Sequence, residues 1–234
     1  VVCGAEPLFL TDYIAVGKVI PERIAEIVAG VARGCAKART ALVGGETAEH
    51  PQLLDEDEFD IAGAATGVVE ESKLLGAHRV QPGDVAIAIG SSGVHANGFS
   101  LVRHIIKNAQ LKLDLLVPEL SQTLGEALLS PTTIYSADLL DLIAEVEIHA
   151  MAHITGGGLA ANTERVLPAH LSLTVDRSTW ELPPLFAYLQ NRGSVPLADL
   201  ERTFNCGVGM VLIAPPSSVA GALTHLTSRG HSAW

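Results

Sequence analysis

The chain has 234 residues, of which 48% are hydrophobic, so it holds enough apolar material for a packed core. Its formal net charge is −11 at pH 7, which argues against general binding to nucleic acid or to anionic membranes. A phosphate ligand would have to be held locally, by N–H groups and metal ions. Three widely spaced cysteines, Cys3, Cys35 and Cys206, fit neither a disulfide framework nor a zinc site and favour a reducing cytoplasm.

The first third of the chain predicts a helix packed against a sheet. Residues 21–38 begin with proline and carry apolar side chains at helical spacing. A short strand is expected over residues 41–43, ended by two glycines, so that Glu46 projects from a strand tip. Residues 55–58 are four consecutive acids, which we interpret as a solvated loop. Residues 59–69 have the β-branched and small side chains of a long strand.

The rest of the chain mixes strands and helices. A turn signal at residues 80–84 predicts a boundary near residues 73–80, with residues 1–75 in one domain and 76–234 in a second. Strands are expected at 85–89, 149–153, 171–175 and 208–213, and helices at 99–108, 120–129, 132–146, 159–166, 183–190 and 217–228. Because strands neither alternate strictly with helices nor segregate from them, the sequence predicts an α+β fold with mixed sheets flanked by helices. It contains no uninterrupted apolar run of about 18 residues, so no membrane span is predicted.

Glycine-rich loops are the strongest functional signal. Successive glycines let the backbone adopt positive φ and approach a ligand closely, and consecutive N–H groups at the start of a helix attract anions. Four such loops occur, at residues 44–47, 91–98, 153–158 and 205–209, the third carrying the run His153-Ile154-Thr155-Gly156-Gly157-Gly158. One such turn is common in proteins that bind nothing, but four in one chain predict a single polyanion site.

Several polar side chains near these loops are candidates for chemistry. Glu46 is a candidate Mg²⁺ ligand, and Asp12, a carboxylate in an apolar stretch, is a second. His95 lies among hydroxyl and amide side chains, where its imidazole could titrate near neutrality and act as acid, base or oxyanion partner. His153 adjoins the triple glycine. The alternatives are capping or surface roles for the carboxylates and packed structural roles for the histidines.

Two further loop residues differ in their expected roles. Asn205 precedes a Gly-Val-Gly run and is a candidate ligand-facing amide, with a turn asparagine as the alternative. Cys206 has no base nearby in the sequence and is interpreted as a packing residue. The other histidines lack polar neighbours and are given no role: His50, His78, His104, His149, His170, His225 and His231. The chain contains neither a Walker-type phosphate loop nor a hydrolase nucleophile elbow.

Five segments in order, residues 3–9, 43–49, 90–98, 153–158 and 203–210, resemble the phosphoribosylformylglycinamidine cyclo-ligase family, also called aminoimidazole ribonucleotide synthetases. The resemblance implies an enzyme of purine biosynthesis that uses ATP and Mg²⁺ to close formylglycinamidine ribonucleotide into aminoimidazole ribonucleotide, releasing ADP and phosphate. It also implies a two-domain α+β architecture and a homodimer in which the N-terminal domains join their sheets. The other expected partners are small molecules, formylglycinamidine ribonucleotide and ATP, and neither nucleic acid nor a membrane is expected.

The resemblance also distributes the candidate residues over the site. It matches Glu46 to the family's metal-site glutamate, and the loop with His95 and Asn97 to its substrate side. The candidates are, for ATP, Gly44, Gly45, Glu46 and Thr47; for substrate or phosphate, Ser91, Ser92, Asn97, Thr155, Gly156, Gly157, Gly158 and Asn205; for metal, Glu46 and Asp12; and for catalysis, His95 and His153.

The chain also departs from the family pattern. Family members begin earlier, with a lysine and aspartates of the ATP and metal site, and extend past Trp234, so this chain is expected to be a fragment that is inactive alone. Thr133 stands where the family has arginine, and Ala96 and Phe99 stand where it has serine and tyrosine. Two alternatives stay open: another ATP-dependent synthetase or kinase of the same superfamily, and a non-catalytic module that dimerises or binds nucleotide.

Overall fold

The computed structural model describes residues 1–234 and divides them into two compact units. The first unit contains Cys3–Leu74 and Ile134–Asp141, and the second contains Leu75–Thr133 and Leu142–Trp234. The chain thus passes from the first unit to the second next to the predicted boundary at residue 75. That residues 76–234 fold as an independent domain stays a prediction.

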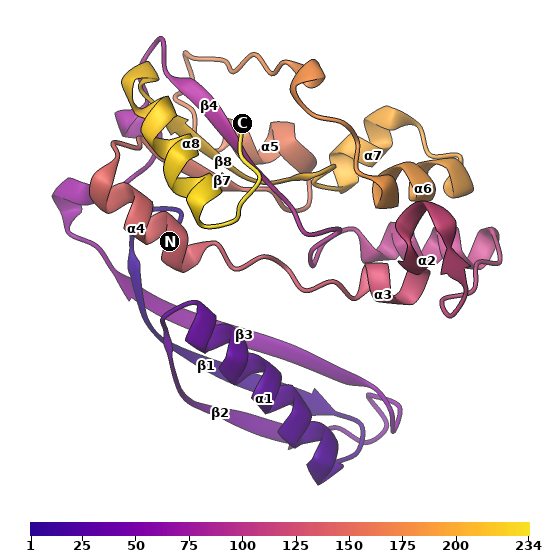
Figure 1. Ribbon diagram of the computed structural model, residues 1–234. Helices are drawn as coiled ribbons and strands as arrows, with labels where there is room; N and C mark the ends of the chain where they lie inside the picture. The colour runs from indigo at the N-terminus through magenta and orange to yellow at the C-terminus, as the bar shows by residue number, and fades with distance from the viewer. The chain divides into compact units, whose positions relative to one another are not determined.

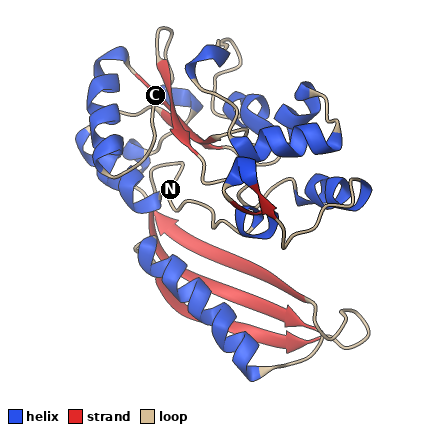
Figure 2. Ribbon diagram, turned by 45° about the vertical axis from the view of Figure 1, so that its right-hand side comes forward, coloured by secondary structure: helices blue, strands red, loops and turns tan.

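A three-stranded sheet and one long helix make up most of the first unit. Its elements are β1 (Glu6–Val16), α1 (Pro21–Lys37), β2 (Ala41–Glu49) and β3 (Phe59–Val68). β1 lies in the middle, parallel to β2 and antiparallel to β3. Helix α1 lies across one face of the sheet (Figures 1 and 2). The helix predicted over 21–38 and the strand predicted over 59–69 are confirmed.

Strand β2 is longer than its sequence predicts. It continues through both glycines to Glu49, so Glu46 lies within the strand and the predicted strand-tip position is wrong. Glycine is depleted in strands, which is why the pattern indicated an end there. The structure explains why residue 45 is glycine. Asp12 of β1 pairs with Gly45, and a Cβ on Gly45 would collide with the Asp12 carboxylate.

The second unit combines a small antiparallel sheet with several short helices. Its strands are β4 (Val85–Gly90), β5 (Leu116–Val117), β6 (Gln122–Thr123), β7 (Ala150–His153) and β8 (Val208–Ala214). Its helices are α2 (Phe99–Asn108), α3 (Leu124–Leu128), α5 (Gly158–Glu164), α6 (Pro184–Gly193), α7 (Leu197–Thr203) and α8 (Val219–Ser228), and α4 (Ser136–Glu145) is divided between the units. β8 is central in the order β4-β8-β7, and all of its residues are buried.

Two apolar clusters hold the second unit together. One is built on β7 and β8 and includes Ile154 and Ile213. The other gathers side chains of α2, α3, α6 and α7 around Phe186 and Phe204, whose ring centroids lie 5.7 Å apart. The predicted α+β class is confirmed by this mixture of layers (Figure 2). None of the helices combines the length and the apolar composition that crossing a membrane requires.

Three predicted elements differ from the structure. Residues 171–175 form no strand, although the segment contains leucine, threonine and valine, because no neighbouring strand pairs with them. The helix expected over 120–129 is confined to Leu124–Leu128, where Thr123 and Glu126 form a reciprocal cap. The helix expected from residue 132 begins at Ser136.

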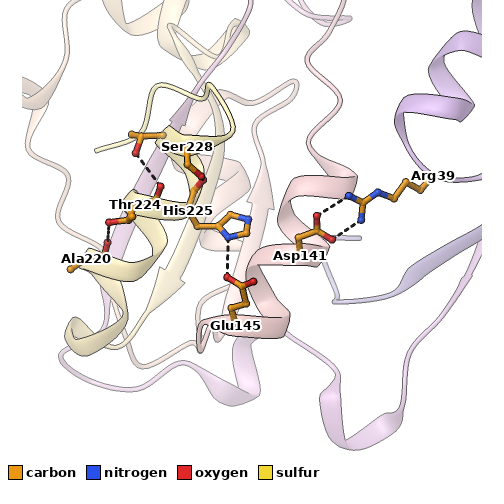
Figure 3. A network of polar contacts seen from close by, with 8 residues as sticks. Arg39, Asp141, Glu145, Ala220, Thr224, His225 and Ser228 are labelled. Carbon is orange, nitrogen blue, oxygen red and sulfur yellow. Dashed lines mark hydrogen bonds and ion pairs between the residues drawn. The ribbon is translucent and has the colours of Figure 1, made fainter.

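An arginine–carboxylate ion pair and a histidine–carboxylate contact connect α4 to residues far away in the sequence. In the first unit, Arg39 donates to both carboxylate oxygens of Asp141, at 2.5 and 2.7 Å. In the second unit, His225 of α8 lies 3.3 Å from Glu145 (Figure 3). A bidentate arginine–carboxylate pair has a specific geometry, and this one helps to place Ile134–Asp141 in the first unit. The two partners are 102 residues apart, so no local pattern could indicate it.

Candidate functional site

Three of the four glycine-rich loops meet in the second unit. The Ser91 N–H donates to the carbonyl of Gly207 at 2.9 Å, which joins the loop after β4 to the start of β8. The Ile154 N–H donates to the carbonyl of Gly209 at 2.9 Å. Asn97 lies beside Gly156, since a Cβ there would be 3.8 Å from Asn97 Oδ1. The fourth loop, residues 44–47, belongs to the first unit.

Asn205 is buried at the junction of these loops, and its amide is used by the protein. Its Oδ1 accepts hydrogen bonds from Ser91 Oγ at 2.8 Å and from the Gly207 N–H at 2.9 Å, while its Nδ2 donates to the Gly93 carbonyl at 2.8 Å. Buried amides are satisfied in this way, and a satisfied amide has little capacity left for a ligand. The geometry therefore gives Asn205 a positioning role, in contrast to the ligand-facing role predicted from its sequence context.

His95 is a buried, neutral side chain. Its Nε2 accepts a hydrogen bond from the Ser92 N–H at 3.1 Å, which places the proton of the neutral ring on Nδ1. Burial, assisted by the charge that His153 would carry, lowers the pKa of His95 to about 4. The expectation that His95 titrates near neutrality is therefore wrong, because the folded protein withholds water from the imidazolium. The ring can offer a hydrogen bond near pH 7 but no positive charge.

His153 ends β7 and faces His95. The two ring centroids are 6.1 Å apart, and burial lowers the pKa of His153 as well. A pair of neutral imidazoles is suited to hydrogen bonding and not to holding an anion by charge. The sequence predicted that His95 and His153 each lie in or next to a glycine-rich loop. In the structure these two loops bring the two imidazole rings close together.

The turn at residues 155–158 follows directly after His153. The Gly158 N–H donates to the carbonyl of Thr155 at 3.1 Å, and Gly157 and Gly158 have φ of +97° and +68°. A Cβ on Gly158 would collide with the carbonyl of Glu201, so that glycine is required by packing. Gly156 is exposed, and a Cβ there would meet only Asn97 Oδ1, at 3.8 Å. The three glycines therefore serve different purposes.

The carboxylates proposed as metal ligands do not converge. Asp12 pairs with Gly45 and Tyr13 with Glu46, and successive residues of a strand point to opposite faces. Asp12 and Glu46 consequently lie on opposite faces of the sheet and cannot bind the same ion. No group of three or more His, Cys, Asp or Glu side chains in residues 1–234 is arranged to hold a metal ion. The residues present do not form a metal centre by themselves.

A cavity of about 220 Å³ opens beside the loop after β4. Its lining includes Ser92 and Gly93 from that loop, Glu119 and Gln122 from the β5–β6 region, and Ser130. The rest of the lining is mainly apolar and includes Leu120, Leu185 and Phe186, so the cavity suits a small molecule with both polar and apolar parts. The cavity lies beside the loop that the resemblance assigns to the substrate, and its use by a substrate stays a prediction.

Sequence reasoning also missed two buried polar residues. Asn162 of α5 makes several hydrogen bonds to the turn at residues 155–158. His149 lies between Asp84, at 2.7 Å from its Nδ1, and Glu147, at 3.2 Å from its Nε2. The partners of Asn162 lie within seven residues of it, but no recognised motif links them, and Asp84 lies 65 residues from His149. Cys206, by contrast, matches its predicted packing role: burial raises the pKa of its thiol to about 12.

Comparison with known proteins connects this site to a family. Residues 1–69 match the profile described as AIR synthase related protein, N-terminal domain, and residues 81–234 match that of the C-terminal domain. The phosphoribosylformylglycinamidine cyclo-ligase of Pseudothermotoga lettingae is 47% identical over 231 residues, covering 99% of this chain and 68% of the relative. That of Nitrosococcus oceani is 49% identical over 234 residues, covering 100% and 65%. The chain thus spans about two thirds of the length of these curated relatives.

Solved structures share the fold at much lower identity. The hydrogenase maturation protein HypE of E. coli has a TM-score of 0.62 and 18% identity, with 97% of this chain and 65% of that one covered. Thiamine-monophosphate kinase from Stenotrophomonas maltophilia has a TM-score of 0.63 and 16% identity, with 99% and 69% covered. Since both family profiles match and relatives are almost half identical along the whole chain, the chain belongs to the AIR synthase family, among the phosphoribosylformylglycinamidine cyclo-ligases.

Proposed function

We propose that this chain acts within an ATP-dependent carbon–nitrogen ligase that closes formylglycinamidine ribonucleotide into aminoimidazole ribonucleotide, with release of ADP and phosphate. The observation that carries the proposal is the identity of 47% and 49%, over almost the whole chain, to enzymes named for this reaction. The sibling enzymes considered from sequence are less favoured, since thiamine-monophosphate kinase is only 16% identical.

In this proposal the second unit binds the phosphorylated substrate. The N–H groups of the turn at residues 155–158 receive a phosphate, and Asn97, beside Gly156, faces the same ligand. The cavity beside Ser92 accommodates a polar part of the substrate. Neutral His95 and His153 contribute hydrogen bonds. Ring closure driven by phosphoryl transfer depends mainly on positioning and on stabilising developing charge, for which such preorganised groups are suited.

ATP is assigned to the first unit, at residues 44–47. Glu46 is exposed there, and its Oε1 is engaged only locally, by the Thr47 N–H at 3.1 Å. Mg²⁺ would accompany the nucleotide, but Asp12 and Glu46 do not form a binding site for it. Three free cysteines fit the cytoplasmic location expected for such an enzyme.

The test uses the full-length protein that contains this chain. With ATP and formylglycinamidine ribonucleotide it is expected to yield a diazotisable aminoimidazole. Glu46→Gln should lower ATP-dependent turnover by about 10- to 100-fold, because Glu46 belongs to the proposed ATP site. The unfolding midpoint should stay unchanged, because the side chain is exposed. Glu26→Gln, on an exposed position of α1, is the matched control and should leave turnover unchanged.

Two results would contradict the assignments. Full activity in Glu46→Gln would return that residue to a structural role. Absence of aminoimidazole, together with activity on another phosphoryl acceptor, would favour a sibling enzyme of the superfamily.

A further inference from the structure

His149 is buried between two carboxylates of the second unit. Its side chain is 6% exposed, with Nδ1 2.7 Å from Asp84 Oδ2 and Nε2 3.2 Å from Glu147 Oε1. An ionised carboxylate only accepts hydrogen bonds, whereas a neutral imidazole donates from one nitrogen alone. Both contacts are therefore hydrogen bonds at the same time only when the ring is an imidazolium, which donates from Nδ1 and from Nε2.

The Asp84 carboxylate depends on this charge. Its side chain is also only 6% exposed, and His149 is the only side chain that forms an ion pair with it. The Gln81 N–H donates to the same Oδ2 at 2.8 Å, but a peptide group carries no net charge. Because a buried carboxylate without a counter-charge is strongly unfavourable, the protonated His149 ring is the group that compensates Asp84.

These contacts hold residues 76–84, the entry segment, with which the chain enters the second unit from the first. At one end of the entry segment, the Gly76 N–H donates to the His149 carbonyl at 2.9 Å. At the other end, Asp84 Oδ2 accepts from both the His149 ring and the Gln81 N–H. A single residue, directly before β7, thus holds both ends of the entry segment.

The other charged groups near the ring do not pair with it. In the entry segment these are His78 and Arg79, and neither forms an ion pair with the two carboxylates. β8 accepts the His149 N–H at its Ile213 carbonyl, at 2.8 Å, and contains no titratable side chain. Glu145, at the end of α4, lies 3.3 Å from a histidine of α8 instead. The charge on His149 therefore acts on Asp84 and on the second carboxylate alone.

We propose that His149, Asp84 and Glu147 form a protonation-dependent clasp, which holds the entry segment in place when His149 is an imidazolium and loosens when the ring loses its proton. The inference does not depend on the proposed function. The clasp stabilises the folded chain at lower pH and weakens as the pH rises, because the imidazolium makes both hydrogen bonds and the neutral ring makes one. This effect is opposite in sign to that of the buried His95.

The test measures amide exchange at Gly76 and Gln81 by NMR in the full-length protein that contains this chain. The measurements run from about pH 5.5 to about pH 8.5, the range in which histidine changes its charge. Protection factors, which correct for the intrinsic pH dependence of exchange, should fall about 10-fold as the pH rises, because a hydrogen bond between charged groups is weakened. The ¹⁵N signals of the His149 ring should change from the imidazolium to the neutral form over the same range.

Three variants separate the charge of the clasp from its packing. His149→Lys keeps a cation that does not titrate in this range, so protection should stay high at every pH. His149→Gln has no charge, so protection should be low at every pH. Glu147→Gln alters a side chain that is 61% exposed, so the protein should stay folded. Its amide can donate to the neutral ring as well as accept from the charged one, so the fall with pH should become smaller.

Glu181→Gln is the matched control, because it removes an exposed carboxylate of the second unit outside the clasp, and it should behave as the wild type does. Wild-type protection that stays constant across the range would overturn the proposal. A fall of wild-type size in His149→Lys or in Glu147→Gln would also overturn it. If neither variant of His149 folds, Glu147→Gln and the ring signals of the wild type decide the question.

Discussion

At the scale of single residues, the site combines buried neutral side chains with exposed backbone donors. His95 is 5% exposed and gives its Nε2 lone pair to the Ser92 N–H, so that atom cannot also accept a proton from a substrate. His153 lies against it with a lowered pKa. An anionic ligand must therefore be stabilised by N–H groups and by cations outside this pair. In the proposed function the two histidines could donate hydrogen bonds to the ligand, but they would not neutralise its charge.

The lowered pKa of His95 predicts a pH-dependent stability. The unfolded chain has an ordinary histidine pKa of 6.5, whereas the folded value is about 4, so the unfolded state binds the proton first as the pH falls. The contribution is complete above pH 6.5 and is lost progressively as the pH falls through about 4. It amounts to at most about 3 kcal/mol, and His153 acts in the same direction.

Urea unfolding between about pH 7.5 and pH 4.5 measures this dependence. His95→Asn should flatten it, because asparagine tolerates the φ of +60° at this position and does not titrate. An imidazole signal of His95 that titrates near pH 6.5 in the folded protein would contradict the expected burial, as would equal slopes in the two proteins.

At the scale of elements, the sequence located those whose own side chains carry the pattern. α1 has an apolar stripe and a proline start, and β8 is a continuous apolar run, so both were predicted within a few residues. The predicted β2 ended too early because one of its glycines, Gly45, makes room for the Asp12 carboxylate of the neighbouring strand. Residues 171–175 have a strand pattern without a partner strand.

In the candidate site too, the sequence indicated features with a local pattern and missed those that depend on contacts made by the fold. The glycine-rich loops were visible as composition, and three of them do meet in the second unit. The roles of Asn205 and Asn162 depend on which carbonyls the fold brings within reach of each amide, and residues 93 and 205 are 112 positions apart. A single sequence identifies such loops but not the buried side chains that hold them in place.

The turn after β7 offers a prediction that separates packing from binding. Gly158→Ala should destabilise the protein by about 2 kcal/mol or more, because its φ is +68° and a Cβ would collide with the Glu201 carbonyl. Gly156→Ala should change stability by less than about 1 kcal/mol, because its nearest neighbour would be Asn97 Oδ1 at 3.8 Å. Chemical unfolding of both variants checks this.

Phosphate titration then completes the comparison. Gly156→Ala places a methyl group at the exposed mouth of the turn, so it should weaken phosphate binding while the protein stays folded. If Gly156→Ala proves as destabilising as Gly158→Ala, the division of roles between the glycines is incorrect.

At the scale of the whole molecule, the first-unit sheet has a face that α1 does not cover (Figures 1 and 2). Ile14 and Val16 are each 1% exposed, whereas Tyr13, between Ile14 and Asp12, is 39% exposed and points to the opposite face. All residues of β3 are exposed. Phe9, Tyr13 and Val68 are large apolar side chains exposed on this face, whereas Phe59 and Ile61, which are also exposed, pair with Val16 and Ile14 and lie on the other face. Apolar surface of this kind is typical of an interface, which supports the proposed homodimer.

A charge on the open face should therefore separate the subunits. Ala64 pairs with Thr11 and so shares the face of Tyr13, and it is exposed in the single chain. Ala64→Lys should leave the monomer folded but weaken the dimer by about 3 kcal/mol, roughly 100-fold, because the ammonium would be buried without a partner. Analytical ultracentrifugation distinguishes the 24.5 kDa chain from a species of twice that mass.

Ala36→Lys, exposed on α1, is the control and should remain dimeric. A wild-type chain that sediments as a monomer at all concentrations, or an Ala64→Lys protein that sediments as the dimer, would remove this face from the proposed interface.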